Sequence, residues 1–246
     1  DAIPEELLSD GAPEWGEPLA TALAEPLARA ELFGTLNRLS LIARDSDAHI
    51  LTLHRVVQAV LRDELNEDSQ HRWAKRAVRA VTRGFPKVEF STWPQCERLL
   101  PQAQAAAAWI ERWEFAFVEG GLLLNNAAGY LGERGRYAEA EPLHQRALAI
   151  FERALGPDHP NVAQSLNNLG VLYRDQGRWA EAEPLLQRAL AIREHALDPN
   201  HPDVAQSLNN LGMLYRDQDR WAEAEPLYQR ALAIFERALG PDHPNV

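Results

Sequence analysis

Cysteine, methionine and long hydrophobic runs are scarce in this 246-residue sequence. The one cysteine, Cys96, cannot form a disulfide within the chain, which excludes a disulfide scaffold and a cysteine-based zinc cluster. The longest apolar run, residues 105–110, is far shorter than the ~20 residues of a membrane-spanning helix. Residues 1–4 lack the pattern of a signal peptide, so we expect a cytoplasmic protein. The single methionine is Met213, and we therefore expect the sequence to be part of a longer chain.

Basic residues and catalytic motifs are also lacking. The 25 Lys and Arg against 36 Asp and Glu give a net charge of −11, which argues against nucleic acid as a ligand. No G-x-x-x-x-G-K-[ST] phosphate loop and no nucleophile elbow occurs in the sequence. Histidines 159, 201 and 243 recur every 42 residues. One helical pair would separate each from the next by about 10 Å, too far to share a metal. We expect no enzyme site, no metal and no cofactor in this chain.

The dominant feature of the sequence is an internal repeat, which decides the architecture. Residues 137–178 and 179–220 are identical at 33 of 42 positions. Residues 221–246 begin a third copy and differ from 137–162 at two of 26 positions. A fourth, diverged copy occupies roughly residues 93–136.

Each copy of the repeat predicts two helices. In the first, residues 162–176, Leu166, Leu169, Gly170 and Tyr173 follow the i, i+3, i+4, i+7 spacing of a buried helix face. The second runs from about residue 180 to 196. Glutamates at its start, such as 181 and 183, are expected to be solvated, since negative charge is favourable at a helix N-terminus.

The spacing Leu166, Leu169-Gly170, Tyr173, Ala182, Leu186, Ala189 resembles the tetratricopeptide repeat. The 42-residue period with LNNLG…GRWAEAEPL…RAL is similar to the longer variant found in kinesin light chains and many bacterial proteins. The resemblance covers residues 115–246 strongly and 69–114 weakly. It implies a mainly α fold in which helical hairpins stack into a right-handed solenoid with a concave inner surface.

The first 66 residues carry no repeat and read differently. A predicted helix over 27–39 is followed by two short strands, 41–45 and 49–53, and by a second helix over 54–65. This order is that of the second half of a winged-helix domain with a small β-hairpin. DNA binding is disfavoured, because residues 1–66 hold 5 Arg, no Lys and 12 acidic residues.

The segment Leu53-His54-Arg55-Val56-Val57-Gln58 after the hairpin resembles the end of the winged-helix module in STAND-type signalling ATPases of the NB-ARC class. In that family a histidine within a Met-His-Asp-like motif contacts the β-phosphate of ADP. The resemblance assigns this nucleotide-sensing role to His54 and implies ADP or ATP as a ligand of a parent protein, although Leu53 and Arg55 replace the Met and Asp. The alternative is a histidine that caps its own helix.

Three segments are therefore expected. Residues 1–66 form a partial winged-helix domain, residues 67–114 a helical adaptor or degenerate tetratricopeptide hairpin, and residues 115–246 the solenoid. In the adaptor, Ser69 is expected to cap a helix over 71–83, and a second helix is expected over 99–113.

One face of the first helix in each repeat is predicted to line the concave groove. A carboxamide can donate to a peptide carbonyl and accept from a peptide N–H at once, and an arginine adds affinity for carboxylates. The asparagines could equally satisfy neighbouring helix ends, with no ligand involved. The predicted peptide-groove residues are Gln164, Asn167, Val171, Arg174, Gln206, Asn209, Met213, Arg216 and Asn125, with Leu122 and Gly129 beside Asn125.

The predicted function is binding of a peptide or protein by the repeats, as the sensing arm of a STAND-type ATPase whose upstream domain is a further partner. Two alternatives remain: a constitutive scaffold without a nucleotide switch, and a solenoid that self-associates through its ends. Self-association would use apolar residues expected at the exposed end, namely Leu227, Leu232, Ile234 and Leu239.

Overall fold

The computed structural model describes residues 2–239, and the chain divides into two compact units, residues 1–130 and 131–246. The fold is mainly helical with one small antiparallel sheet, as predicted. The three-segment division at residues 66 and 114 stays a prediction.

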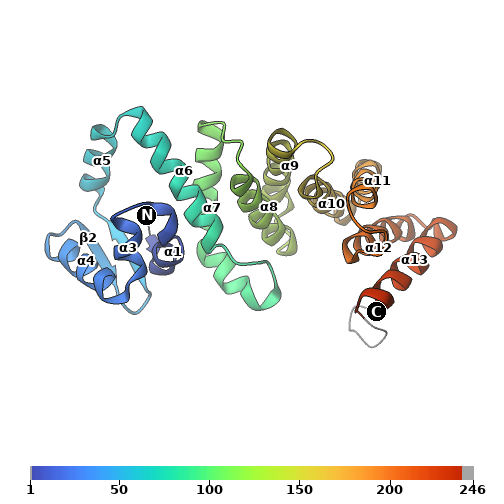
Figure 1. Cartoon of the computed structure of the whole chain (residues 1–246), viewed down its shortest axis with the longest axis horizontal. Helices are drawn as coiled ribbons and strands as arrows, with labels where there is room; N and C mark the ends of the chain where they lie inside the picture. Colours follow the sequence, from blue (N-terminus) through green and yellow to red (C-terminus); the bar gives the residue numbers. More distant parts are fainter. Residues whose placement is uncertain (1, 240–246) are drawn as a thin grey trace. The chain divides into compact units, whose positions relative to one another are not determined.

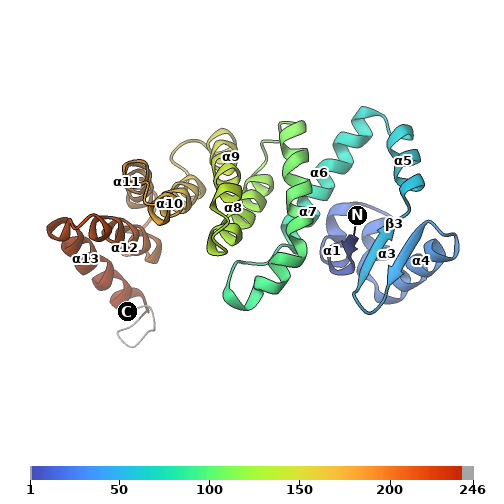
Figure 2. The ribbon, with the colours of Figure 1, turned by 180° about the vertical axis from the view of Figure 1, so that it is seen from behind.

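The sheet in the first unit has three strands rather than the two of the expected hairpin. Strands β2 (Ile42–Asp45) and β3 (Ile50–Leu53) form that hairpin, and β1 (Ala2–Pro4) pairs antiparallel with the other edge of β3 (Figure 2). The turn is closed by Asp45, whose carboxylate accepts hydrogen bonds from the backbone N–H of residues 47 and 48. A strand of three residues is too short to show alternation in the sequence, which is why β1 was not predicted.

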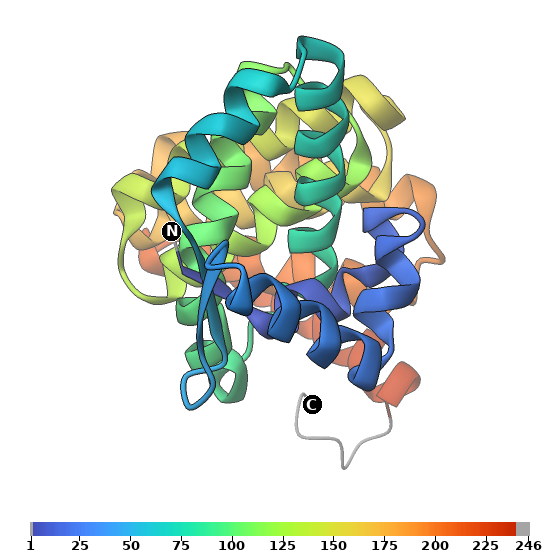
Figure 3. The same ribbon diagram turned by 90° about the vertical axis from the view of Figure 1, so that its left-hand side faces the viewer.

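Five helices belong to the same region: four lie between β1 and β2 in the sequence, and the fifth follows β3. They are α1 (Glu5–Asp10), α2 (Ala12–Trp15), α3 (Leu19–Ala24), α4 (Pro26–Arg38) and α5 (Arg55–Glu64). Helices α4 and α5 fall where they were predicted, and α4 packs against β2 (Figure 3). The core of this region joins Ala12, Leu23 and Phe33 of the helices to Ile42 and Leu51 of the sheet. Its assignment as a winged helix stays a prediction.

Two long helices, α6 (Glu67–Gly84) and α7 (Trp93–Arg112), pack together and complete the first unit with the short 3₁₀ turn η1 (Phe90–Thr92) and most of α8 (Val118–Glu133). Both begin earlier than predicted. The cap of α6 is Asn66, which accepts from the backbone N–H of Ser69 at 2.9 Å, so Ser69 itself is not the cap. Cys96 is buried in α7.

The second unit is built from the repeats. After the end of α8 come α9 (Tyr137–Leu155), α10 (Pro160–Asp175), α11 (Trp179–Ala196), α12 (Pro202–Asp217) and α13 (Trp221–Leu239). Helices α10 and α11 lie side by side, as do α12 and α13, which makes each pair one hairpin (Figure 1). None of the helices described for residues 2–239 is long and apolar enough to cross a membrane.

The hairpin interior follows the predicted stripe. Leu166, Leu169, Gly170 and Tyr173 are all buried. Gly170 is required by close packing, because a Cβ there would lie 2.7 Å from Cγ of Leu186 on α11. The sequence spacing therefore identifies the partner face of α10 correctly.

The connectors between hairpins use their histidines as helix caps. Nδ1 of His159 accepts from the backbone N–H of Asn161, and Nδ1 of His201 accepts from that of Asp203, both at 3.1 Å. Among residues 2–239 no group of three or more His, Cys, Asp and Glu side chains could hold a metal ion. His243 lies outside the described residues.

Candidate binding face and contacts between repeats

The predicted groove residues of α10 separate into two groups in the structure. Gln164 is exposed and Val171 is half-buried, so both reach solvent. Asn167 is only 4% exposed, and its Oδ1 accepts from Nδ2 of Asn210 on α12 at 2.9 Å. Arg174 is largely covered and donates to Asp175 at 2.6 Å. Asn167 and Arg174 therefore lie in the contact between the first helices of successive hairpins.

The equivalent residues of α12 are more accessible. Gln206 and Arg216 are exposed, and Asn209 and Met213 are half-buried. The difference arises because α12 covers this side of α10, whereas no helix after α13 is described that could cover α12. Asn125, on α8 in the first unit, is buried. Whether any of the predicted groove residues binds a ligand stays a prediction.

The solvent-facing side of α10 differs from the predicted face at two of its four positions, each by one residue. It contains Asn168 where Asn167 was expected, and Asp175 where Arg174 was expected. Gln164 and Asn168 are joined by a hydrogen bond of 2.7 Å from Nε2 to Oδ1. We name this side the α10 face; it consists of Gln164, Asn168, Val171 and Asp175.

Arg193 on α11 was missed in the sequence, although it stands beside this face. It is 2% exposed and donates to the backbone oxygen of Asp203 at 2.9 Å, to Oγ of Ser207 at 2.8 Å and to Oε1 of Gln164 at 2.5 Å. Burial lowers the pKa of the Arg193 guanidinium from its ordinary value, and the Asp203 carboxylate opposes that shift. The signal was available: the other copies have Phe151 and Phe235 at this position.

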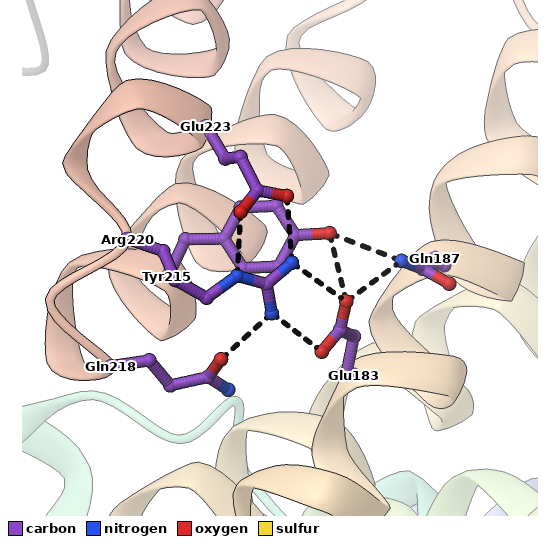
Figure 4. Close-up of polar contacts among 6 residues, drawn as sticks. All are labelled: Glu183, Gln187, Tyr215, Gln218, Arg220 and Glu223. Atoms are coloured by element: carbon purple, nitrogen blue, oxygen red, sulfur yellow. Dashed lines mark hydrogen bonds and ion pairs between the residues drawn. The ribbon is translucent and has the colours of Figure 1, made fainter.

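Arg220, in the turn between α12 and α13, centres a polar cluster that joins successive hairpins (Figure 4). Its guanidinium lies 4.0 Å from the centre of the Tyr215 ring and donates to Glu183 of α11 at 2.8 Å and to Glu223 of α13 at 2.7 Å. The Tyr215 hydroxyl donates to Oε1 of Glu183 at 3.1 Å and accepts from Gln187 at 3.1 Å. Glu183 is therefore an acceptor for the next hairpin.

The same cluster occurs one repeat earlier. Arg178 lies 4.0 Å from the Tyr173 ring centre and donates to Glu141 of α9 at 2.6 Å. This hydrogen bond from Arg178 holds the pKa of the Glu141 carboxyl below its ordinary value. The prediction that these glutamates are merely solvated is wrong for Glu141 and Glu183, because both are half-buried and paired with the arginine of the following repeat.

His54 caps its own helix, the alternative considered in the sequence. It is exposed, and its Nδ1 accepts from the backbone N–H of Val56 at 3.3 Å. An Nδ1 that accepts leaves the proton on Nε2, so Nε2–H is a hydrogen-bond donor. No residue of α5 is buried, and Val56, Val60 and Leu61 expose much of their apolar surface.

Comparison with known proteins agrees with this description. The tetratricopeptide repeat family matches residues 121–195, 166–232 and 203–246. Residues 1–70 match a family described as Domain of unknown function (DUF7779). A nucleotide-binding leucine-rich repeat (NLR)-like protein of Hyaloscypha variabilis is 34% identical over 138 residues, which are 56% of this chain. The chain spans only 14% of the length of that relative.

Solved structures show the same fold. BtubC (BKLC) from P. vanneervenii is 22% identical, with a TM-score of 0.56 over 98% of this chain and 94% of its own. A putative kinesin light chain of Podosopora anserina with nearly identical TPR-like repeats is 21% identical, with a TM-score of 0.51 over 75% of this chain and 84% of its own. The matched ranges together span residues 121–246, more than half of the sequence, and the chain belongs to the tetratricopeptide repeat family.

Proposed function

We propose that the repeats bind a peptide or protein segment along the α10 face and the accessible side chains of Gln206 and Met213 on α12. The observation that carries this proposal is the fixed orientation of Gln164. Its Oε1 is held by buried Arg193 and its Nε2 by Asn168, although the residue itself is exposed. A side chain whose rotamer is already fixed loses less entropy when a ligand binds.

The ligand is best sought by photo-crosslinking rather than by alanine substitution of the asparagines. Asn125 and Asn167 are buried, so their replacement would disturb packing as well as any groove. With benzoylphenylalanine at position 171 in the whole chain, we expect one protein from the source lysate to crosslink at least tenfold more than with the same group at exposed position 195. Equal crosslinking at 171 and 195 would remove the α10 face as a binding surface.

The repeats are further proposed to be the ligand-sensing arm of a STAND-type ATPase of the NB-ARC class. The described nucleotide-binding relative supports this proposal, as does the place of His54 directly after the hairpin. The exposed apolar side of α5 offers a surface that the nucleotide-binding domain of such a parent protein would cover. Nε2–H of His54 would then donate to a phosphate of ADP, and the protein would act in the cytoplasm.

The nucleotide role of His54 predicts a specific defect in a polypeptide that carries both the nucleotide-binding domain and this chain. Asparagine is a strong helix N-cap, so His54→Asn keeps the start of α5 and removes the imidazole donor. We expect bound ADP to dissociate at least tenfold faster from this variant.

Arg55→Ala is the matched control for His54→Asn and should release ADP at the wild-type rate. If ADP release were the same in wild type and His54→Asn, and partner binding did not depend on nucleotide, the constitutive scaffold would be the better description.

A further inference from the structure

The apolar end predicted from the sequence is smaller in the structure. Ile234 is buried and Leu227 is half-buried, while the side chain of Leu239 lies outside the described part. A polar cavity in the first unit carries more chemical information than this end.

The cavity has a volume of about 380 Å³ and lies between α1, α4, α7 and the turn that joins β2 to β3. This volume is at the lower end of the range of small-molecule sites, about 300–1,000 Å³. Among the described residues that line it, none is a Phe, Tyr or Trp that could stack on a nucleobase. The lining residues are Glu5, Glu6, Ser9, Arg29, His49 and Arg98. Such a wall suits a small and polar ligand.

The two carboxylates of the cavity are each paired with an arginine. Arg44 donates to both oxygens of Glu5, at 2.6 and 2.9 Å. On the other carboxylate, Nε of Arg98 lies 2.7 Å from Oε1 of Glu6, and Nη2 of Arg98 donates to Oε2 at 3.2 Å. Each pair is neutral, so the two pairs leave the charge of the cavity to its remaining groups.

Those remaining groups are Arg29 and His49. Nη1 of Arg29 donates to the backbone oxygen of Leu23 at 2.8 Å, and within residues 2–239 its guanidinium forms no ion pair. The His49 imidazole is exposed and has no hydrogen bond to a described residue. The hydrogen bond from Arg44 lowers the pKa of the Glu5 carboxyl, and the nearby His49 and Arg29 add to this effect. The cavity therefore holds an excess of positive charge and of unused N–H donors, which favours an anion.

The backbone of His49 is fixed at the wall of the cavity. Its φ of 53° lies in the left-handed region, which histidine adopts more readily than most residues. Its backbone oxygen accepts from the backbone N–H of Glu5 at 2.9 Å and from Nη2 of Arg98 at 3.0 Å. The turn is thus held by both α1 and α7, and a ligand would meet a wall that is already formed.

The donors of the cavity come from three separate elements, namely Ser9 of α1, Arg29 of α4 and His49 of the turn. A tetrahedral phosphate monoester presents three oxygens in different directions, whereas a carboxylate presents two oxygens in one plane. The Ser9 hydroxyl donates to the backbone oxygen of Glu6 at 3.0 Å and can rotate towards a ligand. The carboxylates of Glu5 and Glu6 would repel an anion, but their remaining lone pairs can accept from hydroxyl groups.

We infer that this cavity binds a small phosphorylated sugar or polyol. Arg29, His49 and Ser9 hold its phosphate, and Glu5 and Glu6 accept hydrogen bonds from its hydroxyl groups. The site uses residues of the first unit alone, so it does not depend on the proposed binding of a peptide by the repeats.

Isothermal titration calorimetry of the whole chain in phosphate-free buffer tests the inference. The probes are glycerol 3-phosphate, ribose 5-phosphate and glucose 6-phosphate. We expect at least one of them to bind with a Kd of about 1 mM or lower. The same compounds without phosphate, and inorganic phosphate alone, should bind at least tenfold more weakly.

Two variants should each weaken binding of that probe at least tenfold. Arg29→Gln removes the guanidinium, and His49→Asn removes the imidazole while asparagine still tolerates the left-handed conformation of the turn. Arg38→Gln is the matched control, because Arg38 is an exposed arginine of the same helix that donates to Thr35 outside the cavity. It should bind the probe as wild type does.

The inference is overturned if none of the three probes binds, or if both variants bind as tightly as wild type. Equal affinity for inorganic phosphate would overturn the assignment of a sugar or polyol phosphate. Circular dichroism checks that each variant is folded. If Arg29→Gln loses helical signal, His49→Asn alone decides the result.

Discussion

Replacing Arg193 by alanine is expected to lower the free energy of unfolding of the repeats by about 3 kcal/mol or more. The change would leave a cavity beside α12. It would also leave the Asp203 backbone oxygen, the Ser207 hydroxyl and Oε1 of Gln164 without their donor. Urea denaturation followed by circular dichroism measures the loss.

Replacing Arg193 by phenylalanine is expected to raise the free energy of unfolding by about 1–3 kcal/mol. Well-packed apolar residues often replace a buried charged group favourably. Phe151 occupies the equivalent position of the previous repeat and is 1% exposed, so the fold accepts this side chain. Arg188→Ala, at an exposed arginine paired with Glu152, is the control and should change stability by less than about 1 kcal/mol. A phenylalanine variant less stable than wild type would mean that the hydrogen bonds of Arg193 outweigh the cost of burying its charge.

Acidification from pH 6.5 to pH 4 is expected to destabilise the repeats through His144. Burial lowers the pKa of this imidazole to about 4, from an ordinary value of 6.5. Between these pH values the unfolded state binds a proton that the folded state does not bind. The free energy of unfolding is therefore highest above pH 6.5 and falls as the pH drops towards 4. The shift corresponds to about 3 kcal/mol over this window. Unfolding in urea at half-unit pH steps would record it.

His144→Leu provides the control, because Leu186 is the equivalent residue of the next repeat and is buried in the same way. We expect this variant to lose most of the pH dependence between 6.5 and 4.5. Hydrogen bonds from Arg178 hold the pKa values of the Glu141 and Glu181 carboxyls below their ordinary value, so their contribution to stability is lost only at lower pH. An unchanged pH profile in His144→Leu would contradict the assignment.

The repeat register was sufficient to predict the helices of residues 137–239 and the buried stripe of α10, because a 42-residue period and 3.6-residue spacing are both visible in one sequence. It was insufficient to predict which of the proposed groove residues are buried between successive helices. Asn167 and Asn168 differ by about 100° around the helix. Which of them meets solvent depends on where α12 packs, and that is a property of two repeats together.

Features created by single contacts were also beyond the sequence. β1 needs only three residues and the edge of β3, and α6 begins at Glu67 because the carboxamide of the preceding Asn66 caps the helix. The partners of Arg193 come from α10 and α12, so no local sequence pattern indicates them. For His54, the position before a predicted helix was enough to suggest that it caps that helix. The same position was not enough to establish a role in a nucleotide site.

The ladder of Arg178 and Arg220 has a mechanical consequence. Each arginine bonds only the hairpin before it and its own hairpin, so the contacts form a chain of links between neighbours and none reaches further. Because the links lie in series, a pull on the two ends loads all of them equally, and a terminal hairpin, which has only one neighbour, is expected to open first. The solenoid would then lengthen in steps of about one repeat, as one hairpin after another opens.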